Sequence, residues 1–337
     1  MGANEASPAL SREAPMLEAE GLRKLFESRG GRAIVRAVDG LSFALGRGEV
    51  LGLVGESGCG KTTTGKLLMR LIEPTSGTIR LEGVDATVLD READFAYRRR
   101  VQMIFQDPYA SMNPHFKVRD VLEEPLLIHR IGQSRAERLE LIAEAMEKVK
   151  MTPVSDFMER YPHMLSGGQR QRIATARTLI LRPSVIVADE PVSMIDLSTR
   201  AEILHLMKSI QAEMELSYLY ITHDISTARF FADRIAVMYL GRIVEMGTQD
   251  EVIDRPAHPY TRALIGAVCE PVAGRARIMR ELAIKGELPS ATEIPSGCRF
   301  RTRCLYATEE CAALPEPELV DIGGGHLQAC RRWKEIH

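Results

Sequence analysis

The chain has 337 residues, enough for two domains or for one large domain with an extension. Its 44 Lys and Arg residues nearly balance 46 Asp and Glu residues, for a formal net charge of −2, which argues against a nucleic-acid partner. No run of about 18 apolar residues could span a bilayer, and residues 1–15 lack the apolar centre of a signal peptide. We therefore expect a cytosolic protein that reaches a membrane only through a partner.

The first segment of the chain predicts a strand, a loop and a helix in direct succession. Residues 1–15 are expected to form a disordered leader, and residues 16–38 have a short, β-like pattern. Val50–Val54 is an apolar run flanked by glycines, which is typical of a strand buried on both faces. The residues from Thr62 onward have the apolar spacing of a helix.

The segment between this strand and this helix, residues 55–62, fits the pattern G-x-x-x-x-G-K-[ST] of a phosphate-binding loop. In such loops the backbone N–H groups and the helix N-terminus surround phosphate oxygens. Lys61 would reach the β- and γ-phosphates, and the Thr62 hydroxyl would be a ligand of Mg²⁺. The predicted nucleotide contacts of this loop are Gly55, Ser57, Gly58, Gly60, Lys61, Thr62 and Thr63.

The middle of the chain predicts a helical subdomain over residues 107–180. Ser134 and Glu137 have the spacing of a capping box, and apolar residues follow at helical intervals. Residues 165–169, Leu-Ser-Gly-Gly-Gln, stand just before another predicted helix. A serine and two glycines at a helix start can bind an anion through free N–H groups. A simple serine cap would not explain both glycines, because each glycine weakens a helix.

Two further strands are predicted to end in titratable residues. The apolar residues 185–188 lead into Asp189 and Glu190, and Ser217–Thr222 leads into His223. Strands that alternate with helices indicate a mostly parallel sheet, whose carboxyl ends meet at one edge. At that edge Asp189 could hold Mg²⁺ through water, and Glu190 could polarise the attacking water.

Together these segments resemble the nucleotide-binding subunits of ABC transporters over nearly the whole chain. The resemblance implies an α/β fold, a P-loop NTPase cassette with a mostly parallel core sheet, an antiparallel β subdomain and a helical subdomain. It also implies that the chain pairs head to tail with a second ABC ATPase, identical or homologous. Ser166 of one subunit would then face the γ-phosphate held by Lys61 of the other, so ATP binding closes the dimer and hydrolysis opens it.

The resemblance assigns roles to single residues as well. Gln106, Glu190 and His223 would form the catalytic group, with Gln106 also near Mg²⁺ and coupled to a membrane subunit. Asp196 would contact the partner across the dimer, although Met194-Ile195 replaces the more usual Ala-Leu before it. The remaining nucleotide contacts would be Phe26, as a ring stacked on adenine or else a core residue, and Ser166, Gly167, Gly168 and Gln169.

The last segment of the chain differs in character, because prolines recur and long apolar runs stop after about residue 254. We expect an ABC domain over residues 16–255 and a C-terminal extension over residues 256–337. Residues 258–261, His-Pro-Tyr-Thr, and the segment 106–114 resemble the ATPases of oligopeptide and dipeptide importers. That branch also moves nickel and some sugars.

Four cysteines are grouped in this extension, and Cys269 is expected to be a small buried apolar residue. A reducing cytosol argues against disulfides, and four thiols in a proline-rich segment suggest a metal that orders it. The spacing lacks the C-x2-C pairs of common zinc sites, and four cysteines also suit a [4Fe–4S] cluster. Members of the resembled branch carry such a cluster, which favours iron–sulfur over zinc or free buried thiols at Cys298, Cys304, Cys311 and Cys330.

The resemblance implies the ATPase subunit of an importer at the cytoplasmic face of the inner membrane. Its partners would be two transmembrane permease subunits and an extracytoplasmic substrate-binding protein. We expect peptide as the substrate, with nickel or an oligosaccharide as alternatives. One alternative is a soluble ABC protein that acts on ribosomes or DNA, which the single cassette disfavours. Another is a regulatory protein that closes on ATP and signals without hydrolysis, which the presence of Glu190 and His223 disfavours.

Overall fold

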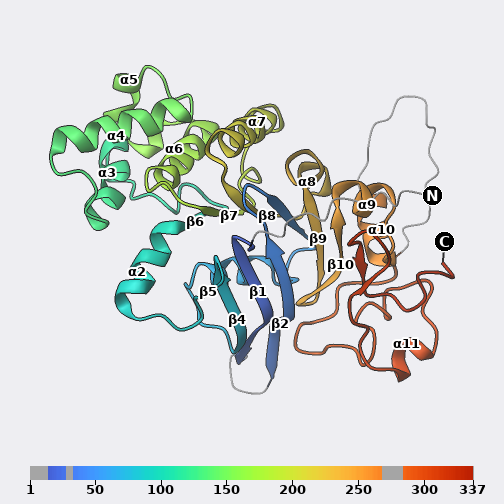
Figure 1. Cartoon of the computed structure of the whole chain (residues 1–337). Helices are drawn as coiled ribbons and strands as arrows, with labels where there is room; N and C mark the ends of the chain where they lie inside the picture. Colours follow the sequence, from blue (N-terminus) through green and yellow to red (C-terminus); the bar gives the residue numbers. More distant parts are fainter. Residues whose placement is uncertain (1–13, 28–32, 268–283, 337) are drawn as a thin grey trace, which may run out of the picture.

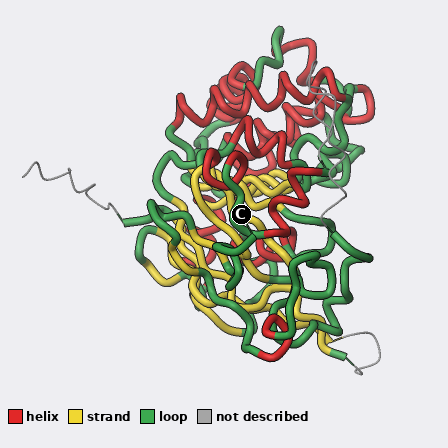
Figure 2. The backbone as a smooth tube through the Cα atoms, turned by 90° about the vertical axis from the view of Figure 1, so that its right-hand side faces the viewer, coloured by secondary structure: helices red, strands yellow, loops and turns green. Residues whose placement is uncertain are grey.

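The computed structural model describes residues 14–27, 33–267 and 284–336. Nearly all of the predicted leader, and Cys269, lie outside these residues. The chain forms a large central sheet, a smaller antiparallel sheet beside it and a group of helices at one end (Figure 1). When the molecule is turned, this group of helices lies above the strands, and other helices lie beside and below the strands (Figure 2). None of the helices in the described ranges combines the length and the apolar composition that a membrane span requires.

Within the described residues the larger sheet has eight strands in the order β11-β12-β10-β9-β3-β8-β7-β6. Strands β9, β3, β8, β7 and β6 run parallel to their neighbours, while β10, β12 and β11 continue the sheet antiparallel. The mostly parallel core is therefore confirmed. The strands are β3 (Val50–Val54), β6 (Val101–Ile104), β7 (Val185–Asp189), β8 (Ser217–Thr222), β9 (Arg234–Tyr239), β10 (Arg242–Thr248), β11 (Val320–Asp321) and β12 (Leu327–Gln328).

Both faces of the central sheet are covered by apolar side chains. Successive side chains of a strand point to opposite faces, and on the central strands both sets are buried. Ile186 and Tyr218 belong to the apolar core that includes most of the helices. Val187 and Leu219, their neighbours in the chain, belong to a second core under the antiparallel sheet. Burial on both faces explains why these strands are continuous apolar runs in the sequence.

The antiparallel sheet has the order β2-β1-β4-β5. Its strands are β1 (Leu17–Glu27), β2 (Ile34–Leu45), β4 (Ser76–Leu81) and β5 (Val84–Asp85). Helix α1 (Lys61–Leu68) joins the two sheets in sequence, and α2 (Arg91–Arg100) leads into β6. This sheet is the antiparallel β subdomain that the resemblance implied.

The helical group follows β6 and lies at one end of the molecule (Figure 1). Its helices are α3 (Val118–Ile128), α4 (Arg135–Lys148), α5 (Val154–Met158) and α6 (Gly167–Leu179), and a 3-10 turn covers Pro162–Met164. Helix α7 (Leu197–Met214) follows β7. Ser134 caps α4 by accepting from the Glu137 N–H at 3.1 Å. The second half of the predicted capping box is wrong, since the Glu137 carboxylate accepts from the Gln133 N–H instead.

The C-terminal segment of the chain is joined to the central sheet at its edge. Strand β12 pairs with β10, and β11 pairs with β12. The helices of this half are α8 (Ile225–Phe231), α9 (Gln249–Asp254), α10 (Pro259–Gly266) and α11 (Glu310–Ala313). The extension thus lies at the opposite end from the helical group (Figure 1).

Candidate nucleotide-binding site

The predicted phosphate loop lies directly after β3, and α1 begins at its lysine. A Cβ atom on Gly55 would lie 2.3 Å from the Met238 carbonyl oxygen, and one on Gly60 would lie 2.1 Å from the Ala37 carbonyl oxygen. Only glycine therefore fits at these two positions. Lys61 is buried, and its ammonium group donates to the carbonyl oxygens of Gly55 at 2.7 Å and Glu56 at 2.9 Å.

The other predicted residues of this loop are near its tip and at the start of α1. Ser57 and Gly58 are exposed, Thr63 is half-buried, and the Thr62 hydroxyl lies 3.3 Å from an Asp189 carboxylate oxygen. Asp189 is buried, and burial raises the pKa of its carboxyl, with the Thr62 hydroxyl opposing and Glu190 adding to the rise. A divalent cation beside it would favour the ionised form. Thr62 and Asp189 could therefore hold Mg²⁺ together.

Glu190 is the meeting point of the three predicted catalytic residues. Its carboxylate accepts from the Gln106 amide nitrogen at 3.0 Å, and its other oxygen lies 2.9 Å from His223 Nδ1. The Glu190 side chain is 15% exposed and that of His223 is 56% exposed, so the group opens to solvent on the histidine side. Glu190 has φ +47°, a left-handed conformation that non-glycine residues rarely adopt and that occurs often at functional sites.

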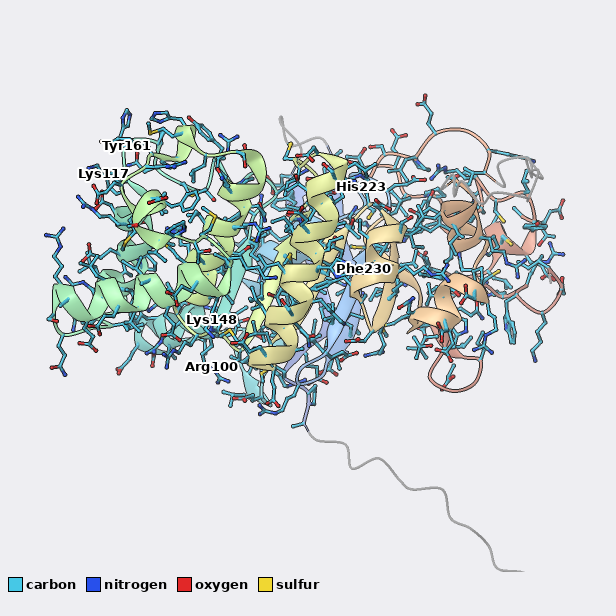
Figure 3. All side chains as sticks on the ribbon, turned by 90° about the horizontal axis from the view of Figure 1, so that it is seen from above. Arg100, Lys117, Lys148, Tyr161, His223 and Phe230 are labelled. Atoms are coloured by element: carbon cyan, nitrogen blue, oxygen red, sulfur yellow. The ribbon has the colours of Figure 1, made fainter. Side chains whose placement is uncertain are left out.

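The order of the strands explains how these distant residues meet. β3, β8 and β7 are neighbours, and each is followed by one component of the site. Gly55 follows β3, His223 follows β8 and Glu190 follows β7. His223 lies near the middle of the molecule, away from Lys117 and Tyr161 in the helical group (Figure 3). The expected convergence at the carboxyl edge of the parallel strands is what this topology produces.

Ser166 lies elsewhere, at the exposed N-terminus of α6. Its hydroxyl accepts from the Gln169 N–H at 3.2 Å, and the Gln169 side chain accepts from the Ser166 N–H at 3.0 Å. A Cβ atom on Gly168 would lie 2.5 Å from the Thr199 methyl group, so a larger residue here would force Thr199 to shift and packing within the chain favours glycine. A Cβ atom on Gly167 would meet nothing closer than 3.9 Å. Gly167 is thus the glycine that internal packing leaves unexplained.

The structure places the remaining two predicted contacts on the surface. Asp196 is exposed and caps α7 by accepting from the Thr199 N–H at 3.0 Å. The hydrogen bond from the Ser198 hydroxyl, with those from Thr199, lowers the pKa of Asp196 to about 2. Phe26 is 39% exposed on β1, with the Lys24 ammonium 5.1 Å from its ring centre. The alternative of a core phenylalanine is therefore wrong.

Two residues that touch the phosphate loop were not predicted from the sequence. The Tyr260 hydroxyl accepts from the Glu56 N–H at 3.0 Å, and the Arg303 guanidinium pairs with the Glu56 carboxylate. Both come from the C-terminal half, far away in sequence. Tyr260 belongs to the His-Pro-Tyr-Thr segment, which was the one local signal that could have pointed to it. No local pattern distinguishes Arg303 from the arginines around it.

The four cysteines of the extension line one small pocket with Phe300 and His258. All four are free thiols. Burial raises the pKa of Cys298 and of Cys330 to about 11, and the neighbouring thiols of the group contribute to the rise. Within residues 14–27, 33–267 and 284–336, however, no group of three or more His, Cys, Asp or Glu side chains is arranged to hold a metal ion. The arrangement of ligands thus gives the predicted iron–sulfur or zinc site no support.

Two family models match the sequence. The model "ABC transporter" matches residues 38–193, and "Oligopeptide/dipeptide transporter, C-terminal region" matches residues 244–311. The dipeptide transport ATP-binding protein DppF of Escherichia coli (strain K12) is 46% identical over 322 residues, which cover 94% of each chain. DppF of Haemophilus influenzae is also 46% identical over 322 residues, 94% of this chain and 96% of the relative.

Solved structures of ATP-binding cassettes resemble the fold. A dimeric post-hydrolysis state of the cassette MJ0796, bound to ADP and Pi, has a TM-score of 0.63 and 28% identity, over 69% of this chain and 99% of that one. The cassette cbiO1 of Clostridium perfringens, part of the transporter complex cbiONQ, has a TM-score of 0.63 and 26% identity, over 72% and 92% of the two chains. Because relatives that are 46% identical cover 94% of the chain and the cassette fold agrees, the chain belongs to the ABC transporter family, as an ATP-hydrolysing subunit.

Proposed function

We propose that this chain is the ATPase subunit of a peptide importer and that the Gln106–Glu190–His223 group performs the hydrolysis. The observation that carries the proposal is the hydrogen bonding of both Glu190 carboxylate oxygens, one to Gln106 and one to His223. A carboxylate fixed in this way beside the Mg²⁺ ligands can orient a water and accept its proton. Lys61 and Thr62 would hold the β- and γ-phosphates and the metal.

The second half of each site would come from a partner ATPase. Ser166 is exposed at the start of a 13-residue helix, where free N–H groups and the helix dipole favour an anion. Gly167 leaves room for close approach, because a Cβ atom there would still be 3.9 Å from its nearest neighbour. The related cassette MJ0796 forms a dimer. A γ-phosphate gripped between Lys61 of one chain and Ser166 of the other would make ATP a component of the interface.

Peptide is the proposed cargo because DppF, 46% identical over nearly the whole chain, is a dipeptide transport protein. The C-terminal match to oligopeptide and dipeptide transporters supports the same branch. The test is uptake by vesicles that hold the complete transporter, with labelled dipeptide, nickel and an oligosaccharide offered in parallel. We expect ATP-dependent uptake of the peptide alone, abolished by Glu190→Gln in this subunit. ATP-dependent uptake of nickel or sugar without peptide would contradict the proposed cargo.

A permease subunit would attach at the cavity beside Gln106. This cavity of about 200 Å³ lies among β6, α3 and α6 and is lined by Met103, Phe105, Ile128, His129 and Arg177, among others. Phe105 is 38% exposed and Ile128 is 55% exposed, which leaves an apolar rim. Because Phe105 directly precedes Gln106, a permease helix bound here would be coupled to the conformation of the Gln106–Glu190–His223 group. This is how a soluble ATPase would be held at the cytoplasmic face of a membrane.

We propose that the cysteine pocket holds a [4Fe–4S] cluster, as the resemblance implies, although its four side chains would first have to move, because in the described residues they are not arranged as metal ligands. Four cysteine sulfurs are a full ligand set for one. They line a common pocket whose burial opposes negative charge on Cys298 and Cys330, a cost that bound iron would offset. Protein purified without oxygen should contain iron and sulfide, and Cys304→Ser should lose both. A colourless protein with stoichiometric zinc, or with four free thiols, would contradict this.

A further inference from the structure

The segment 298–304, Cys-Arg-Phe-Arg-Thr-Arg-Cys, packs directly on the nucleotide-binding region of the chain. The buried Arg299 pairs with Asp39 of β2. The Phe300 ring packs against Tyr239 and Tyr260, with ring centres 5.3 and 5.5 Å apart. By contrast, Arg301 turns back to the Ser296 carbonyl within the extension itself.

Arg303 reaches furthest and contacts the phosphate loop. Its two terminal nitrogens lie 2.7 and 3.0 Å from the two carboxylate oxygens of Glu56, a bidentate pair. The Arg303 side chain is 8% exposed and that of Glu56 is 27% exposed. Paired geometry of this kind is among the stronger charge-assisted contacts, and it fixes the direction of the carboxylate as well as its charge.

Glu56 is held on two further sides. Its backbone N–H donates to the Tyr260 hydroxyl at 3.0 Å, and its carbonyl oxygen accepts from the Lys61 ammonium at 2.9 Å. Tyr260 also packs against Phe300, so both contacts to Glu56 from outside the loop come from one aromatic and arginine cluster. Glu56, one of the two residues whose carbonyl oxygens accept from the predicted phosphate-binding lysine, is therefore also the residue that the extension holds.

A glutamate in this position needs such a partner. The loop binds a polyanion, and a carboxylate among its residues would repel the phosphates if its charge were not balanced. Arg303 balances the charge and keeps the carboxylate turned toward the extension. An ion pair that served only to attach the extension would not need to end on the phosphate loop, since Arg299 and Asp39 already make a more buried attachment.

We propose that Arg303 is a positioning residue for ATP: by neutralising and orienting Glu56, the C-terminal extension sets the affinity of the phosphate loop for nucleotide. This inference rests on the proposed ATP site. It gives the extension a direct role in nucleotide binding. The residue with this role is next to Cys304, at the edge of the cysteine pocket.

The test compares Arg303→Gln with Arg301→Gln in the full chain. Glutamine keeps a hydrogen-bond donor and much of the side-chain volume but removes the charge. We expect Arg303→Gln to raise the KM for ATP about tenfold while kcat changes less than about twofold, as the coupling of close charged groups allows. Arg301→Gln should match the wild type, because the Arg301 guanidinium donates to Ser296 and, in the described residues, makes no hydrogen bond to the phosphate loop. Arg303→Lys, which keeps the charge but not the bidentate geometry, should fall between the two.

The double variant Glu56→Gln, Arg303→Gln separates positioning from simple attachment. With no carboxylate to neutralise, its KM should return to within about twofold of the wild type, the mark of strong coupling between the two residues. A KM in Arg303→Gln equal to that of Arg301→Gln would overturn the inference, as would a double variant no better than Arg303→Gln. If Arg303→Gln does not fold, an unchanged Kd for ATP in Arg303→Lys would overturn it in the same way.

A parallel titration of Lys61→Ala with ATP distinguishes a failure of the proposed ATP site from a failure of the proposed role of the extension. Wild-type affinity in Lys61→Ala would show that the ATP site itself is misplaced, and the proposed function would fail. Loss of binding in Lys61→Ala together with wild-type behaviour of Arg303→Gln would leave the ATP site intact. In that case only the role of the extension would be wrong.

Discussion

At the scale of single residues, the proposed hydrolysis depends on the environment of Glu190. The sequence places an acidic pair after an apolar strand, but it does not show that Gln106 and His223 take one carboxylate oxygen each. These contacts arise from residues 84 and 33 positions apart in the chain. The resemblance named the three residues, and the structure adds the geometry on which a mechanism can be based.

Replacing Glu190 by glutamine should leave ATP binding intact and slow hydrolysis. Glutamine keeps the size of the side chain but cannot accept the proton of the attacking water, so turnover should fall by roughly 10²–10⁴-fold. Steady-state hydrolysis and ATP titration of the purified chain measure the two effects. Glu140→Gln, an exposed change on α4, is the matched control. Unchanged turnover in Glu190→Gln would remove this residue from the reaction.

The burial of His258 predicts that the free energy of unfolding falls at acidic pH. Burial lowers the pKa of this imidazole to about 4, with Glu245 opposing. Because the unfolded chain binds a proton near its ordinary pKa of 6.5 and the folded chain does not, stability must fall as the pH drops from about 6.5 toward 4. The loss between about pH 7 and pH 5 should be about 2 kcal/mol.

The control for this effect is His258→Asn. The His258 ring accepts from the Tyr260 N–H at the start of α10, and asparagine can serve as a cap there without titrating. Denaturant unfolding at the two pH values should show a clearly smaller loss in the variant. Equal losses in both proteins would mean that another group is responsible.

At the scale of elements, the start of α6 combines two roles that substitution can separate. Ser166 caps the helix, and we propose that it also faces a γ-phosphate. Aspartate caps a helix as well as serine does, but its charge would oppose the phosphate. Ser166→Asp should therefore keep its stability within about 0.5 kcal/mol and lose about 100-fold or more in hydrolysis, since like charges at an interface cost several kcal/mol.

Ser134→Asp is the matched change, because Ser134 caps α4 through the same kind of bond. It should affect neither stability nor hydrolysis. Thermal melts and hydrolysis rates of the two variants provide the comparison. If Ser166→Asp hydrolyses ATP like Ser134→Asp, the start of α6 is a cap and nothing more.

The rim of the cavity beside β6 provides a prediction about the permease. Ile128→Glu places a charge in an apolar rim, which should weaken copurification with the transmembrane subunits and leave hydrolysis by the isolated chain unchanged. Val88→Glu is a control on an 88% exposed residue near the antiparallel sheet. Equal recovery of permease with both variants would place the docking surface elsewhere.

At the scale of the whole molecule, the sequence predicts the nucleotide-binding region better than the extension. Val50–Val54 and Ser217–Thr222 have the predicted bounds because strands buried on both faces are continuous apolar runs. The phosphate loop was predictable because its pattern is local in the sequence, and Gly58 and Gly60 take φ angles of +80° and +111° that favour glycine. The pairing of β12 with β10 was not, since two-residue strands leave no periodic pattern. Contacts such as Arg303 with Glu56, 247 positions apart, depend on that packing.

The central claim is that one ATP is shared between two chains, and a mixing experiment tests it directly. Lys61→Ala lacks the phosphate-binding lysine, and Ser166→Asp lacks the partner contact, so neither should hydrolyse ATP alone. In a head-to-tail dimer their mixture restores one complete site, from Lys61 of one chain and Ser166 of the other. An equal mixture should recover about a quarter of the wild-type rate, because half of the dimers carry one intact site of two. If the wild-type chain hydrolyses ATP but the mixture of the two variants does not, ATP is not shared between Lys61 of one chain and Ser166 of the other.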